Sequence, residues 1–139
     1  MQLVIDANVY IFGFGFVKET ACEKLLLTIA EKPNLFTLRI SRSIVKEISR
    51  NLSPEDFQKS VRFINLLTKI DEDFLVPFEM GAKYEAKGLK PADALIAAYA
   101  EWTGADILVT ENRHFLSRRG GLPFKILTAQ NCYKLLASA

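Results

Sequence analysis

Four polar side chains stand where short structural units of this sequence meet, and together they could bind a divalent metal ion. Asp6 follows the apolar run 3–5, and Glu47, Asp93 and Asn112 recur at comparable points further along the chain. Hard cations such as Mg²⁺ and Mn²⁺ prefer oxygen ligands, which three acids and one amide supply. No reactive His or Cys stands among them, so the set favours metal-assisted chemistry over a covalent nucleophile.

Three neighbouring polar residues are expected to support this site. Asn8 could orient Asp6 or a water molecule, and Thr110 or Glu111 could hydrogen-bond a water bound to the metal. The sequence leaves structural explanations open for the same region, because an Asp at this point commonly caps the following helix. Asn8 is equally typical of a turn.

The other candidates also have structural alternatives. Asp93 stands in the first turn of a predicted helix, where an acid is stabilised by the helix dipole. Glu47 lies at the border of an apolar helix face and could reach solvent instead of a ligand. Asn112 could be a turn residue. Asp106 begins a predicted strand, so we place it at the opposite end of the sheet and exclude it.

The elements that would position these residues alternate between short apolar runs and longer helical stretches, without repeats or linkers. Ser53-Pro54 marks a helix start and Gly104 a helix end. Strands are predicted near Leu3–Asp6, Phe36–Ile40, Phe74–Phe78, Asp106–Thr110 and Lys125–Leu127. Helices are predicted near Thr20–Glu31, Ser43–Asn51, Pro54–Ile70, Pro91–Thr103 and Ala129–Ala137.

This alternation predicts a three-layer α/β/α sandwich with a mainly parallel central sheet of about five strands. Sites in such sheets form at the carboxyl ends of the strands, where the candidate residues are expected to converge. The segment Tyr10–Val17, with the sequence YIFGFGFV, fits a loop, an irregular helix or an exposed contact surface equally well.

Composition predicts one domain over residues 1–139, with a mass of 15.7 kDa and half of its residues apolar. No apolar run approaches the roughly 20 residues that span a bilayer, and the N-terminus lacks the pattern of a secretory signal. Cys22 and Cys132 are too few and too far apart for a disulfide framework or a zinc site. We therefore expect a cytoplasmic protein with no membrane contact.

The net charge of +2 predicts no partner, but its distribution is uneven. The 28 residues from Asn112 to Ala139 contain no Asp or Glu. A basic end beside an acidic cluster would suit a polyanion held at a metal site, although a solvated basic tail explains it too. The basic residues of this region are Arg113, Arg118, Arg119, Lys125 and Lys134.

Other site classes fit the sequence less well. A haloacid dehalogenase-like phosphatase with Asp6 as nucleophile expects a second Asp at the position of Asn8. A receiver-type signalling domain requires an acidic pair after the first strand and an Asp after the third, and both are missing. The sequence contains no Gly-rich phosphate loop, and the lone His114 does not define a nucleophilic site.

Four segments, in order and over essentially the full length, resemble the PIN-domain nucleases, and specifically the small VapC-type toxins of toxin–antitoxin pairs. The segments are LVIDANV (3–9), ISRSIVKEI (40–48), GLKPADALIAAYAEWTGAD (88–106) and ILVTENRHF (107–115). The resemblance implies a homodimer, Mg²⁺ or Mn²⁺ as cofactor, and hydrolysis of single-stranded RNA.

Carried over by position, Asp6, Glu47 and Asp93 match the three main acids of the family, with Asp6 and Asp93 as direct metal ligands. Asn112 falls where many members have a fourth acid, so the first metal position is retained and the second lacks a carboxylate. Thr110 would help Asn112 to complete the shell. Three basic residues would hold the RNA backbone without reading its sequence: Arg113, Arg118 and Arg119.

The missing fourth acid leaves an alternative, a catalytically degenerate PIN domain that binds RNA or a protein partner without cleavage. If the protein is a toxin, the resemblance implies an antitoxin that covers the acidic cleft with a basic side chain. The aromatic residues Phe12, Phe14 and Phe16 are candidate contacts for it, although a dimer interface or core burial would explain them as well.

Overall fold

The computed structural model describes residues 1–117 and 120–138. Five strands form one parallel sheet in the order β3-β2-β1-β4-β5, which confirms the predicted fold class. The central strand β1 is buried from Leu3 to Ile5, as expected of a sheet covered on both faces. The strands are β1 (Gln2–Ile5), β2 (Thr37–Ser41), β3 (Thr68–Asp71), β4 (Ile107–Val109) and β5 (Lys125–Leu127).

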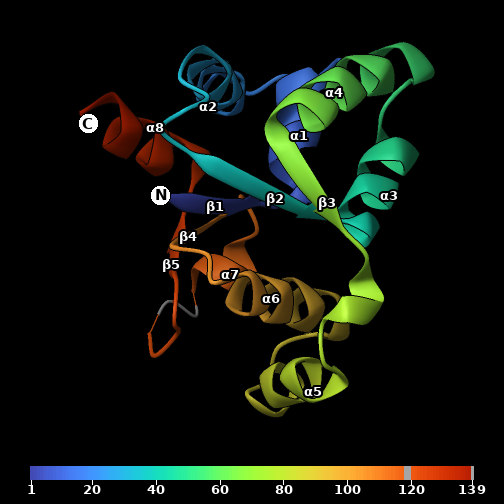
Figure 1. The fold of residues 1–139 in the computed structure, drawn as a ribbon, viewed down its shortest axis with the longest axis vertical. Helices are drawn as coiled ribbons and strands as arrows, with labels where there is room; N and C mark the ends of the chain where they lie inside the picture. The colour runs from blue at the N-terminus through green and yellow to red at the C-terminus, as the bar shows by residue number, and fades with distance from the viewer. Residues whose placement is uncertain (118–119, 139) are drawn as a thin grey trace.

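Helices cover both faces of this sheet, so that the chain forms three layers (Figure 1). One layer contains α1 (Ala7–Phe14), α2 (Thr20–Glu31), α3 (Arg42–Asn51), α4 (Pro54–Leu67) and α8 (Ala129–Ala137). The other contains α5 (Phe78–Ala86), α6 (Pro91–Thr103) and the short α7 (Arg113–Leu116). Within the described residues, no helix has both the length and the apolar character needed to cross a bilayer.

Two local signals in the sequence placed helix ends correctly. The Ser53 hydroxyl accepts a hydrogen bond from the Asp56 amide at 3.1 Å and so caps α4, as predicted. Gly104 ends α6 in the left-handed conformation, with φ of 71°, which glycine adopts without steric cost.

The predicted strand Phe74–Phe78 is wrong. The third strand lies earlier, at Thr68–Asp71, where a continuation of α4 was expected, and a 3₁₀ turn, η1 (Asp73–Leu75), follows it. The apolar residues that suggested a strand are mostly at the surface, since Phe74 is 82% exposed and Phe78 is 86% exposed. Helices α5 and α7 were not predicted, and a helix at the position of α1 was only one of the alternatives left open.

The segment Tyr10–Val17 is largely helical. It continues α1 as far as Phe14, whose ring packs edge-on against Phe63 at a centroid distance of 5.7 Å. Gly13 permits the close approach of α2, because a Cβ there would lie 2.5 Å from a methyl carbon of Leu26. Only the end of the segment is open to solvent: Phe16 is 99% exposed.

A partly buried ion pair fastens α6 to the sheet. Arg39 of β2 donates two hydrogen bonds to the Asp71 carboxylate of β3, at 2.9 and 2.8 Å. The Tyr99 hydroxyl of α6 donates a third, at 2.6 Å, and the Arg39 guanidinium lies over the Trp102 ring. Burial raises the pKa of Asp71, but these hydrogen bonds outweigh it and hold the pKa below its usual range.

We expect Asp71→Asn to lower the free energy of unfolding by about 2 kcal/mol at neutral pH, because Arg39 loses its charged partner. Because the folded-state pKa of Asp71 is lowered, Asp71 stabilises the folded protein at pH values above its unfolded-state pKa. This stabilisation is lost on acidification. Urea denaturation should therefore show that the difference in free energy of unfolding between the wild type and Asp71→Asn becomes smaller below about pH 4.

Glu72→Gln is the matched control, because Glu72 is the next residue and forms a more exposed ion pair with Arg42 at 3.0 Å. Its effect should stay within about 0.5 kcal/mol. Equal losses in both variants would show that the Asp71 network does not anchor α6.

Candidate functional site

Asp6 lies at the carboxyl edge of the sheet, between β1 and α1, and is only 5% exposed. Both oxygens of its carboxylate accept hydrogen bonds. Oδ1 accepts from the Ala7 amide at 2.7 Å, and Oδ2 accepts from the Thr110 hydroxyl at 2.8 Å. Asp6 therefore caps α1, as the structural alternative expected, although through Ala7, and it also joins the loops that follow β1 and β4.

Asn8 ties these two loops together. Its side-chain amide lies 3.5 Å from Asp6 Oδ2 and 3.5 Å from Thr110 Oγ1. Its carbonyl oxygen accepts a hydrogen bond from the Glu111 backbone amide at 3.2 Å. Asn8 and the buried Thr110 thus hold the orientation of Asp6 from two sides.

Asp93 reaches the same edge from the first turn of α6, and Asn112 contacts it. The Asn112 side-chain amide donates to Asp93 Oδ1 at 3.2 Å. The Asn112 carbonyl oxygen accepts from the His114 backbone amide at 2.9 Å and caps α7. In this arrangement Asn112 turns its N–H group towards Asp93 and uses its oxygen within its own loop.

Glu47 completes the acidic group from α3, which begins at the end of β2 and is capped by Ser41. The carboxylates of Glu47 and Asp93 both act on the pKa of Asp6, which is raised to about 6. Burial is the main cause, the hydrogen bonds from Thr110 and Ala7 partly offset it, and the two neighbouring negative charges add to it. Three acids from separate elements therefore share one electrostatic environment.

Within the described residues, none of these three acids forms an ion pair with a Lys, Arg or His. A buried carboxylate beside two like charges is unfavourable unless a cation balances it. The donors are all oxygens, which suits Mg²⁺ or Mn²⁺ better than a softer metal. Asp6 and Asp93 could hold such an ion, with Glu47 beside them.

Glu111 turns away from this group. Its carboxylate accepts from the Cys22 thiol of α2 at 3.5 Å and from the Ala129 backbone amide at the start of α8. Burial, together with Glu111 and Glu19, raises the pKa of Cys22 to about 12. Glu19, Cys22 and Glu111 form a separate cluster with ligand atoms within 4.8 Å of one another. No sequence signal pointed to it, because Glu111 lies 89 residues from Cys22 in the chain.

The basic candidates are placed only in part. Arg113 is exposed at the start of α7, next to Asn112. Arg118 and Arg119 lie outside the described residues.

Comparison with known families agrees with this geometry. The family model of the PIN domain matches residues 2–114, which include every member of the acidic group. The chain belongs to the PIN domain family. The predicted resemblance to PIN-domain nucleases is thereby confirmed, and the family is one of hydrolases that act on phosphodiester bonds.

Solved structures share the fold of this PIN domain at low sequence identity. A chain of VapBC2 from Rickettsia felis, in a crystal structure with a DNA fragment from the promoter, has a TM-score of 0.63 and 19% identity. The match covers 92% of this chain and 98% of that one. PAE2754 from Pyrobaculum aerophilum also has a TM-score of 0.63 and 19% identity, with coverage of 100% and 97%. No curated protein matches the sequence.

We expect Asp6→Asn to stabilise the metal-free protein near neutral pH. The folded-state pKa of Asp6 is about 6 against an ordinary value of 3.8, so the folded protein binds the proton more tightly. The free energy of unfolding of the wild type therefore falls as the pH rises from about 4 to 6, and it stays lower above that range. Removing the charge should recover up to about 3 kcal/mol, measured by urea denaturation in EDTA.

The same variant tests the metal site without an activity assay. Mg²⁺ or Mn²⁺ should raise the melting temperature of the wild type but not of Asp6→Asn. Asp106→Asn is the matched control, because Asp106 lies at the opposite edge and accepts from the Gln2 amide at 2.7 Å. It should keep the response to metal. A wild type that does not respond would contradict metal binding by this group.

Proposed function

We propose that this PIN domain is a metal-dependent endoribonuclease that cleaves single-stranded RNA and serves as the toxin of a toxin–antitoxin pair. The supporting observation is the convergence of Asp6, Glu47 and Asp93 at the carboxyl edge with no balancing cation among the described residues. The proposed setting is the cytoplasm, where RNA is available and where the free thiols Cys22 and Cys132 would stay reduced.

In the proposed reaction, a water molecule attacks phosphorus, the bond to one bridging oxygen breaks, and that oxygen takes up a proton from solvent as it leaves. Glu47 would orient this water and accept its proton. Asp6 and Asp93 would hold Mg²⁺ or Mn²⁺, which supplies positive charge beside the phosphate and makes a nearby water easier to deprotonate. Asn8 and Thr110 fix the direction of Asp6, so the ligand geometry is set before substrate arrives.

Asn112 supports a single metal position in this scheme. It donates to Asp93 rather than adding a fourth carboxylate, and its oxygen is already engaged by the His114 amide. We assign it the positioning of Asp93. Arg113, exposed beside Asn112, is proposed to contact a phosphate of the RNA backbone, and the same role is proposed for Arg118 and Arg119.

Cleavage of labelled single-stranded RNA tests the proposal. Loss of a residue that only supports a metal ligand typically lowers activity by roughly 10- to 100-fold. Asp6→Asn and Asp93→Asn remove proposed ligands, so each should lower the cleavage rate by more than that. Cleavage should require Mg²⁺ or Mn²⁺ and stop in EDTA. Asp106→Asn carries the same chemical change at the opposite edge and should cut at the wild-type rate.

Folded protein that binds RNA without cutting it under any metal would contradict the nuclease. It would support the alternative of a degenerate PIN domain, which the missing carboxylate at Asn112 favours. Cutting that persists in both site variants would place the chemistry elsewhere or in a contaminant.

An antitoxin is the proposed protein partner. The VapBC2 structure, whose chain shares this fold, gives the toxin role its support. The surplus negative charge of the acidic group suits insertion of a basic side chain from that partner. Phe16 is exposed and remains a candidate contact, whereas Phe12 and Phe14 pack against the core.

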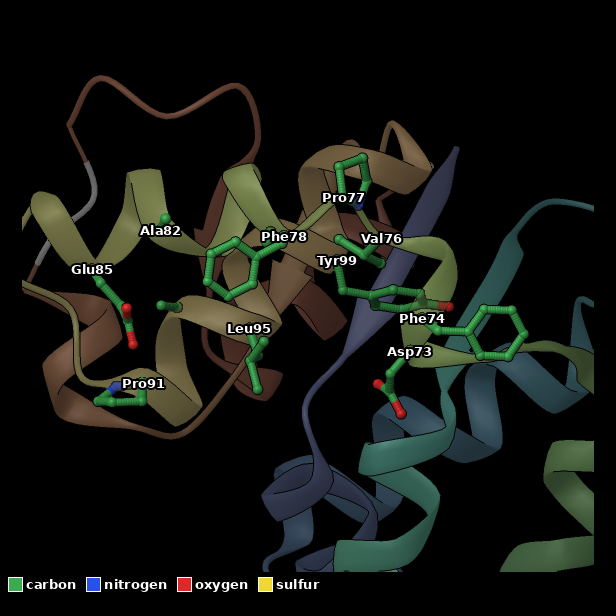
Figure 2. A pocket seen from close by; sticks show the side chains of 13 residues that line it. Asp73, Phe74, Val76, Pro77, Phe78, Ala82, Glu85, Pro91, Leu95 and Tyr99 are labelled. Atoms are coloured by element: carbon green, nitrogen blue, oxygen red, sulfur yellow. The ribbon is translucent and has the colours of Figure 1, made fainter.

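A homodimer is proposed through the surface formed by η1, α5 and α6. These elements line a hollow of about 490 Å³. Figure 2 shows Phe78 and Leu95 among its lining side chains, with Phe74 towards one end and Glu85 towards the other. Clustered exposed apolar side chains mark interaction surfaces, and a hollow beside projecting phenyl rings allows two copies to fit each other by a two-fold axis.

Phe78→Ser should therefore weaken self-association by at least about tenfold, because it removes a projecting aromatic side chain. Light scattering coupled to size exclusion would measure this across a dilution series. Leu66→Ser, at an 82% exposed position on α4, should leave the association unchanged. A wild type that is monomeric throughout would refute the dimer.

A further inference from the structure

A groove between α2 and α8 has the chemistry of a nucleotide-binding subsite. It is a hollow of about 300 Å³ lined by the first two turns of the two helices. Its lining combines two cations, one aromatic ring and small or neutral polar residues: Lys24, Lys134, Tyr133, Thr20, Ala21 and Gln130.

The cations in this groove are available to an anion. Lys24 and Lys134 are exposed, and neither forms an ion pair with a carboxylate in the part of the chain that the structure describes. The Lys24 ammonium lies 6.0 Å from the centroid of the Tyr133 ring, at the outer limit of a cation–π contact. Lys24 is therefore held loosely and can turn towards a phosphate.

Tyr133 supplies a stacking surface. It is half-buried against the core, so its position is fixed while part of the ring faces the groove. Bases of single-stranded nucleic acid stack on such rings, and lysines beside them neutralise the backbone.

The groove is linked to the acidic group through Glu111. Glu111, whose amide is bound by Asn8 of the site, places its side chain against Cys22 of α2 and the Ala129 amide of α8. These two helices form the walls of the groove. Glu111 therefore connects the acidic group to the two helices that carry the groove.

We propose that this groove binds a flanking nucleotide of a single-stranded RNA, with its base against Tyr133 and its phosphates at Lys24 and Lys134. The choice of RNA rests on the proposed function. The groove would bind the strand on one side of the cleaved bond, and the acidic group would act on the bond itself.

Fluorescence anisotropy with a short labelled single-stranded RNA, in EDTA to prevent cutting, measures this binding separately from catalysis. Tyr133→Leu keeps apolar volume and should weaken binding about fivefold or more, whereas Tyr133→Phe keeps the stacking surface and should bind as the wild type does. Because Leu retains core packing, circular dichroism should show both variants folded.

The roles of Lys24 and Lys134 are tested by the salt dependence of RNA binding. This dependence would not change if the two lysines had a purely structural role. The double variant Lys24→Gln/Lys134→Gln should reduce the slope of log K against log salt by about 1.4, at about 0.7 per phosphate contact. The double variant Lys59→Gln/Lys69→Gln makes the same charge change on α4 and β3 and should leave the slope unaltered.

The outcomes separate this inference from the nuclease. RNA binding that depends on the groove, in a protein that never cuts, supports the groove and refutes the nuclease. Cutting and binding that are unchanged in all groove variants refute the groove and leave the nuclease standing. A wild type that does not bind RNA overturns the groove outright.

Discussion

Mutual repulsion among three carboxylates is the constraint that the architecture of this protein has to accommodate. Parallel strands bring the ends of β1 and β4 side by side, and α3 and α6 add Glu47 and Asp93 at the same edge. The pKa of Asp6 is raised mainly by burial, and the two neighbouring negative charges add to that effect. Folding alone gives no reason to gather these charges, so their convergence supports the cation proposed at this edge.

Separate anchors hold two of the acids, Asp6 and Asp93, against this repulsion. Thr110 and the Ala7 amide fix Asp6, Asn112 fixes Asp93, and the contact of Tyr99 with Asp71 holds the helix that carries Asp93. The loop after β4 contributes to both the site and its surroundings. Its successive residues Glu111 and Asn112 turn in opposite directions, one towards α2 and α8 and the other towards α6.

The layered fold and the edge where the acids meet were predictable, because strand–helix alternation and strand ends are local properties of the sequence. Phe74–Phe78 was assigned to a strand because an apolar run does not reveal whether it is buried or exposed. The true third strand is short, polar at Lys69 and ends at Asp71, whose burial depends on Arg39 and Tyr99. Likewise, the sequence shows that residue 112 is an Asn and not an acid. It does not show which way the amide points, because that depends on contacts with Asp93 and His114.

The setting of the two cysteines also has a practical meaning. Both are buried, and burial raises the pKa of each thiol to about 12, with Glu111 and Glu19 adding to the effect at Cys22. Since the thiolate is the reactive form, both native thiols should react slowly at neutral pH. A cysteine introduced on the surface would therefore react selectively with maleimide dyes, so that probes can be attached at chosen positions without first removing the native residues.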